Sequence, residues 1–125
     1  MRGIVMTLAA VVIAAVLFVD FRSIREPPNN AEKLMSEGHQ LYVEYCAECH
    51  QTDGSGYSTL YPRLAGNPIV TLHDPQRIIL TVTYGQGSMM SFQEKLTSQE
   101  IASILTYIRN SWGNQASPVD SRQVH

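Results

Sequence analysis

The sequence predicts a small all-α domain that follows an apolar N-terminal segment. Three observations support this fold class. Apolar residues recur at helical spacing from Glu32 to His50, an aspartate and proline pair at residue 74 is a typical helix start, and a capping box at Thr97 starts a last helix. With 125 residues, the chain has room for one domain of ordinary size and an N-terminal extension.

The N-terminal segment, residues 1–25, is predicted to be a single transmembrane anchor or uncleaved signal. Residues 4–19 are apolar except for Thr7, and a helix of that length covers about 24 Å of a hydrocarbon core of roughly 30 Å. Bulky side chains stand where a cleaved signal peptide has small ones, which favours an anchor. Residues 26–31 contain Pro27 and Pro28 and are predicted to form a short linker.

The first helix of the domain is interrupted by Gly38. A glycine inside a helix costs about 1 kcal/mol relative to alanine. We therefore expect another helix to approach closely at Gly38, one turn before Tyr42, and a tolerated surface glycine is the alternative.

This helix ends in two cysteines three positions apart, followed directly by a histidine. Cys46 and Cys49 can each form a thioether with one haem vinyl group, and His50 can then supply the proximal ligand of the iron. One covalently bound haem c is the predicted cofactor. It uses both cysteines of the chain, so no disulfide supports the fold.

Two other uses of a cysteine pair at this spacing are a redox dithiol and a structural zinc site. A thioredoxin-like dithiol opens a helix in a βαβ unit, whereas Cys46 lies where a helix ends. A structural zinc site needs four ligands, and the two cysteines would require two histidines at irregular spacing. Both patterns fit less well than haem c.

A second helix is predicted between Asp74-Pro75 and Gly85, with Arg77 either solvated or near a haem propionate. The following loop carries Met89 and Met90. Beside a haem-attachment motif, such a methionine pair is a natural source of the second axial ligand. His73 is the rival, because bis-histidine ligation also occurs in haem proteins.

The last helix is predicted from Thr97, where Glu100 completes the capping box, to about Ser111. Its polar face is expected to include Ser103, Thr106 and Arg109. Residues 115–125 are predicted to form a flexible tail.

The charge of the chain argues against nucleic acid as a partner. Nine basic and 11 acidic residues give a formal net charge of −2. The part after the linker is slightly more acidic, which favours a basic or mixed partner surface.

The chain resembles the class I cytochrome c family along residues 32–114. The resemblance depends on an ordered set of motifs: Gly38-x-x-x-Tyr42, Cys46 to His50, Asp53-Gly54-x-Gly56, Pro62-x-Leu64-Ala65-Gly66, Met89-x-x-Phe92 and Leu105-x-Tyr107-x-Arg109. It implies a small all-α fold that holds haem between the first helix, the last helix and the loops.

The resemblance also implies a role for each residue of the site. Cys46 and Cys49 would bind haem covalently, His50 would be the proximal iron ligand, the Pro62 carbonyl would accept from the His50 ring, and Met89 would be the distal iron ligand. Met90 departs from the family, which often has proline there, and is left as the alternative ligand.

Two longer stretches, residues 61–68 and 107–114, are similar to cytochrome domains of bacterial membrane-bound dehydrogenase complexes, although Arg63 replaces a frequent proline. The expected function is therefore one-electron transfer between redox proteins of a dehydrogenase or respiratory complex, without enzymatic activity or a small-molecule substrate. Because haem c is attached outside the cytoplasm, we expect the domain on the periplasmic face of the bacterial inner membrane. The alternatives are a peroxide-binding or gas-binding haem with an open sixth position, and an assembly subunit.

Overall fold

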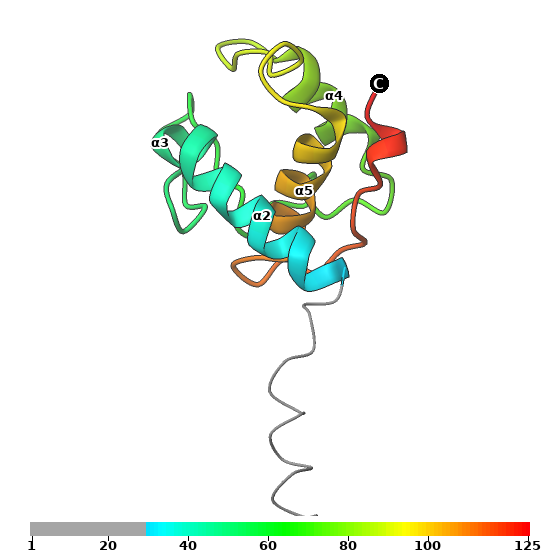
Figure 1. Ribbon diagram of the computed structural model, residues 1–125. Helices are drawn as coiled ribbons and strands as arrows, with labels where there is room; N and C mark the ends of the chain where they lie inside the picture. The colour runs from blue at the N-terminus through cyan, green and yellow to red at the C-terminus, as the bar shows by residue number, and fades with distance from the viewer. Residues whose placement is uncertain (1–29) are drawn as a thin grey trace, which may run out of the picture.

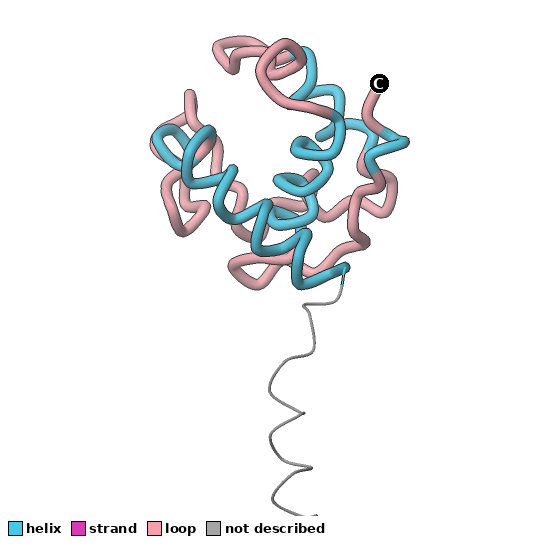
Figure 2. Tube along the Cα trace, in the orientation of Figure 1, coloured by secondary structure: helices cyan, strands magenta, loops and turns pink. Residues whose placement is uncertain are grey.

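The computed structural model describes residues 30–125, which fold into helices connected by long loops (Figure 1; Figure 2). The helices are α2 (Asn30–Tyr45), α3 (Ala47–His50), α4 (Gln76–Tyr84), α5 (Ser98–Arg109) and the 3-10 helix η1 (Ser121–Gln123). Residues 30–125 contain no strand, and two isolated bridges each close a turn. The helical fold class is confirmed for this part of the chain.

The predicted anchor, residues 1–25, lies outside the described residues, as do residues 26–29 of the predicted linker. α2 begins at Asn30, slightly before the expected start at Glu32. Within residues 30–125, no helix combines the length and the apolar character needed to cross a membrane.

α2 and α5 cross at Gly38, as expected from the sequence (Figure 1). A Cβ atom at this position would collide with the carbonyl of Ser103 and lie 2.8 Å from Cβ of Tyr107. Beside the crossing, the Tyr107 ring lies 5.4 Å from the Tyr42 ring and 5.5 Å from the Trp112 ring, between centroids. The glycine therefore allows the two helix backbones to touch, and the aromatic rings fill the space next to them.

The capping box of α5 is present. The Glu100 amide donates to Thr97 Oγ1 (3.2 Å), and the Thr97 amide donates to Glu100 Oε2 (2.8 Å). α5 ends at Arg109, short of the expected end near Ser111. The prediction that Ser103, Thr106 and Arg109 form a polar outer face of this helix is wrong. All three are buried: Ser103 is 0% exposed, Thr106 4% and Arg109 0%.

The burial of that face has a physical cause in the C-terminal residues. Residues 115–125, expected to be a flexible tail, pack along α5 towards α4 (Figure 1). Val119 and Val124 join the core, and the Val119 amide donates to Thr106 Oγ1 (2.9 Å). The Tyr84 hydroxyl donates to the carbonyl of His125 (2.7 Å). Polar groups of α5 thus serve as partners of the tail backbone.

α4 forms where it was expected. Asp74 Oδ1 accepts from the amide of Gln76 (2.9 Å), and Gly85, with φ of +79°, ends the helix. The proline at position 75 occupies the capping position itself, so the aspartate acts one residue earlier than predicted. The apolar face of α4 packs into the core through Ile78, Ile79 and Val82.

Candidate haem site

The two cysteines lie at the junction of α2 and α3. The helix is interrupted at Cys46, and the amides of Cys49 and His50 both donate to the carbonyl of Cys46 (3.2 and 2.9 Å). Both cysteines are free and half-buried, and Cys46 packs against the core. The three residues of the motif are therefore held together in one turn of backbone.

The His50 ring is buried and held by a carbonyl from the following loop. His50 is 8% exposed, and its Nδ1 lies 2.9 Å from the carbonyl oxygen of Pro62, to which it donates. This is the contact that the resemblance implied. With Nδ1 protonated and held, Nε2 is the ring nitrogen available to a metal.

Gly56 allows the Pro62 loop to reach the histidine. Its φ is +68°, its amide donates to the carbonyl of His50 (2.9 Å), and a Cβ atom here would collide with Tyr61 and lie 2.7 Å from the carbonyl carbon of Pro62. The Tyr57 amide donates to the carbonyl of Tyr61 (2.8 Å), which closes the turn. A side chain at Gly56 would separate the loop from the His50 backbone.

The end of α3 is held from α2. The Tyr42 hydroxyl donates to the carbonyl of Gln51 (2.6 Å), where the chain leaves the helix with φ of +64°. Burial raises the pKa of Tyr42, so the hydroxyl remains a donor across the physiological range. This fully buried tyrosine connects the α2–α5 crossing to the residue that follows His50.

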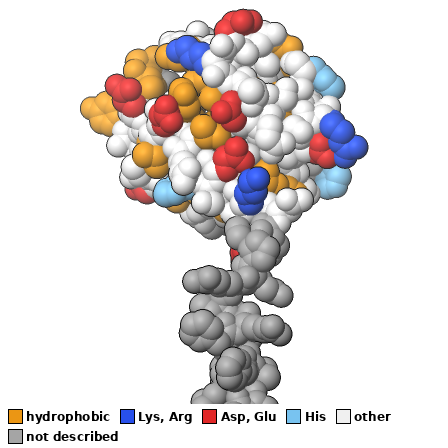
Figure 3. All heavy atoms as spheres, in the orientation of Figure 1, with side chains coloured by type: hydrophobic (Ala, Val, Ile, Leu, Met, Phe, Trp, Pro, Cys, Tyr) orange, Lys and Arg blue, Asp and Glu red, His pale blue; other side chains and the backbone are white. Residues whose placement is uncertain are grey.

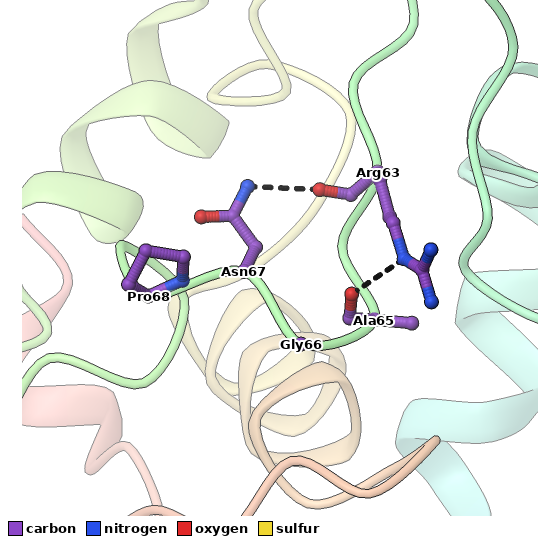
Figure 4. A pocket seen from close by; sticks show the side chains of 5 residues that line it. All are labelled: Arg63, Ala65, Gly66, Asn67 and Pro68. Atoms are coloured by element: carbon purple, nitrogen blue, oxygen red, sulfur yellow. Dashed lines mark hydrogen bonds between the residues drawn. The ribbon is translucent and has the colours of Figure 1, made fainter.

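The loop after Pro62 is a compact turn, shown in Figure 4. Arg63 Nε donates to the carbonyl of Ala65 (2.8 Å), and Asn67 Nδ2 donates to the carbonyl of Arg63 (2.8 Å). Residues 63 and 65–68 line a hollow of about 420 Å³. The turn keeps its shape largely through hydrogen bonds between neighbours in the sequence.

Asn114 is a residue whose structural role the sequence analysis missed. It is 4% exposed, accepts from the Gly66 amide (2.8 Å), and donates to the carbonyls of Leu64 (3.1 Å) and Ile108 (2.9 Å). It thus connects the Pro62 loop to the end of α5. Its only sequence signal was its place in the stretch 107–114, because its partners are distant in the chain.

The two methionines of the α4–α5 loop have different surroundings. Met89 is half-buried and packs against the core, and its backbone pairs with Gln86 (3.0 and 3.1 Å). Met90 is 57% exposed, and its sulfur accepts from Lys95 Nζ (3.4 Å). The loop is held to α4, because the amide of Phe92 donates to the carbonyl of Val82 (3.1 Å).

The surroundings of the cysteines agree poorly with the two rival uses of the motif. Burial, with a contribution from Cys49, raises the pKa of the Cys46 thiol to about 12, which disfavours the thiolate that dithiol exchange requires. Within residues 30–125, no group of three or more cysteine, histidine or acidic residues is placed to hold a metal ion. The rival axial residue, His73, is exposed.

The donor set fits a covalently attached haem. Two free, half-buried thiols lie in one turn with a buried imidazole whose Nδ1 is already engaged. A half-buried thioether is available on a separate loop that packs against the same core. Thiols for attachment, a fixed imidazole and a thioether are the groups that c-type haem uses.

Comparison with known proteins agrees with this donor set. Residues 33–108 match the family model described as cytochrome c oxidase, cbb3-type, subunit III. The chain is 34% identical over 90 residues to the cytochrome c subunit of a quinone alcohol dehydrogenase from Gluconacetobacter polyoxogenes, a match of 63% of this chain and 19% of that protein. It is 38% identical over 91 residues to the gluconate 2-dehydrogenase cytochrome c subunit of Pantoea cypripedii, with 63% and 21% covered.

A smaller relative is cytochrome c-552 of Thermus thermophilus, 32% identical over 94 residues, with 63% of this chain and 70% of that protein covered. The chain thus matches only about a fifth of the length of the two dehydrogenase subunits. The family match extends over more than half of the chain, and its members carry haem c as a covalently bound cofactor. The chain therefore belongs to the cytochrome c family described as cytochrome c oxidase, cbb3-type, subunit III.

Proposed function

We propose that the chain is a one-electron carrier, not an enzyme, and that His50 and Met89 are the axial ligands of its haem c. The observation that carries this proposal is the fixed His50 ring, buried and donating to the Pro62 carbonyl 2.9 Å away. A rigidly held His50 imidazole and the Met89 thioether would together leave no open iron position for a substrate, which suits outer-sphere electron transfer. Haem c itself supplies the one-electron couple.

The other roles follow from the same geometry. Cys46 and Cys49 would form the two thioethers, and Pro62 would keep the His50 ring in one tautomer and orientation. The hydrogen bond to a carbonyl makes the imidazole more electron-rich, which favours ferric iron over ferrous iron. Pro62 would therefore influence the reduction potential without touching the metal.

Met89 is the better candidate for the distal ligand. Its side chain is half-buried against the core, whereas Met90 is mostly exposed and its sulfur already accepts a hydrogen bond from Lys95. Using Met90 would require breaking this contact and turning an exposed side chain inwards. His73, the other rival, would need a comparable rearrangement from the surface.

We further propose that residues 1–25 anchor the protein in the bacterial inner membrane, that the linker ends where α2 begins at Asn30, and that the cytochrome domain that follows lies in the periplasm. The partners would be redox proteins of a dehydrogenase or respiratory complex, with no nucleic acid and no small-molecule substrate. The names of the relatives support this choice, because two are cytochrome c subunits of dehydrogenases.

Partner proteins would contact a surface that combines apolar and acidic side chains. Figure 3 shows apolar side chains exposed next to acidic ones on the side of the molecule where α3 lies. The loop after α3 contributes exposed apolar residues, including Tyr57 (72% exposed) and Leu60 (63%). Such a surface suits brief contacts with apolar and basic partner surfaces.

The test is carbon monoxide binding to the ferrous full-length protein, together with a redox titration. A one-electron carrier should show one reversible one-electron couple and slow or absent binding of carbon monoxide. Rapid binding would instead support the gas-binding or peroxide-binding alternative, because it requires an open sixth position. Cell fractionation with protease applied from the periplasmic side tests the proposed location.

A further inference from the structure

Arg109 is the largest fully buried side chain among residues 30–125. Its Nε donates to the carbonyl of Ser117 (2.9 Å), and its Nη1 donates to the carbonyls of Val70 (2.7 Å) and Leu72 (2.9 Å). Its Nη2 is buried without a hydrogen-bond partner. The guanidinium thus joins α5, the loop before α4 and the C-terminal tail.

Among residues 30–125, no carboxylate accepts a hydrogen bond from Arg109. The three acceptors of Arg109 are neutral carbonyls, whereas the surface residue Arg122 forms an ion pair with Asp120. Burial is the cause that lowers the pKa of Arg109, with no contribution from an acidic neighbour. Arginine stays protonated in proteins even so. The described part of the domain therefore holds a buried positive charge whose hydrogen-bond acceptors are all neutral.

The buried charge and the haem site share one apolar core. Val70, whose carbonyl accepts from Arg109, and Ile108, the residue before it, belong to the cluster against which Cys46 and Met89 pack. A domain of about 100 residues has a radius of gyration of about 13 Å, so two groups that pack against one core are separated by a distance of that order. Salt screens such buried interactions far less than it screens surface pairs.

We propose that Arg109 raises the reduction potential of the haem through its buried, uncompensated positive charge. This inference rests on the proposed one-electron function. Oxidised haem would carry one more positive charge than reduced haem, whose extra electron would come from a donor protein. Repulsion from the Arg109 guanidinium would therefore favour the reduced form. The tail contributes by covering Arg109, since its Ser117 carbonyl accepts from Arg109 Nε.

The test is a spectroelectrochemical titration of the full-length holoprotein in four variants, each with a thermal unfolding measurement. Arg109→Met removes the charge, and Arg109→Gln removes it while keeping an amide donor, which provides a second neutral variant should the first fail to fold. Arg109→Lys keeps the charge at mildly acidic pH. Thr106→Val is the matched control, because it breaks the Val119 hydrogen bond of the tail without changing charge.

The expected result is a more negative reduction potential in both neutral variants. The shift should change the ratio of oxidised to reduced protein several-fold at a fixed applied potential. The potentials of Arg109→Lys and Thr106→Val should stay close to that of the wild type, although both unfold at lower temperature. Added salt should not reduce the difference in reduction potential between the neutral variants and the wild type.

The inference would be overturned if the neutral variants kept the wild-type potential. It would also be overturned if the potential of Arg109→Lys decreased as much as theirs. Failure of the proposed function is distinguishable, because the wild type itself would then lack a reversible one-electron couple.

Discussion

Nδ1 of His50 lies 2.9 Å from the carbonyl oxygen of Pro62, although the two residues are separated by a turn that contains three exposed apolar side chains. The approach depends on Gly56, whose amide donates to the His50 carbonyl and whose missing side chain leaves room for the Pro62 backbone. The orientation of the ring is therefore set by backbone contacts of the loop. This arrangement leads directly to a test.

Gly56→Ala should raise the reduction potential and destabilise the protein. The left-handed backbone costs alanine about 1–2 kcal/mol, and the added Cβ pushes the Pro62 carbonyl away from the imidazole, which makes His50 a weaker electron donor. Gly66→Ala is the matched control, because φ is also positive there (+67°) and no atom lies within 4 Å of the added Cβ. It should cost similar backbone strain and leave the potential unchanged. Equal potentials in the two variants would contradict the role given to Gly56.

Met89→Ala should abolish the ferric absorption band that reports charge transfer from sulfur to iron. It should also open the ferrous form to rapid carbon monoxide binding, because the thioether proposed for the sixth position would be gone. Met90→Ala is the control on the adjacent residue and should keep the band, since Met90 is 57% exposed. Survival of the band in Met89→Ala, with its loss in Met90→Ala, would move the distal ligand to Met90.

Short-range signals in the sequence predicted local structure well. The capping box of Thr97 and Glu100, the stop at Gly85 and the turn that holds Cys46 to His50 each depend on neighbours in the chain. The crossing at Gly38 was predicted too, because a helical glycine on an apolar stripe has few other uses.

The burial of side chains by residues distant in the sequence could not be predicted in the same way. In sequence, Arg109 lies on a polar helix face, and the partners that bury it, the carbonyls of Val70, Leu72 and Ser117, carry no sequence signal. The tail was expected to be flexible for a related reason. Its two valines are separated by polar residues and become core residues only where α5 presents matching groups.

Val119→Ala should lower the free energy of unfolding by about 1–3 kcal/mol, since a fully buried aliphatic side chain loses its packing. The same variant should make the C-terminal residues more accessible to carboxypeptidase. Pro118→Ala is the control, because the neighbouring Pro118 is exposed, and it should change neither measurement appreciably. A tail that is digested equally fast in wild type and both variants would argue against the packed arrangement.

Glu100 should contribute stability that depends on pH. Hydrogen bonds from the Thr97 backbone and side chain hold the pKa of Glu100 below its usual range, so the folded state favours the carboxylate. This contribution is fully present above the ordinary pKa of glutamate and is lost as the pH falls through the lower pKa of the folded state. Glu100→Gln should therefore unfold at a lower temperature than the wild type at about pH 7, with the difference shrinking towards about pH 3. Glu94→Gln, an exposed acidic residue upstream of the same helix, is the control for the loss of one negative charge. A difference between Glu100→Gln and the wild type that stays constant over this range would mean that the α5 cap acts through its geometry alone.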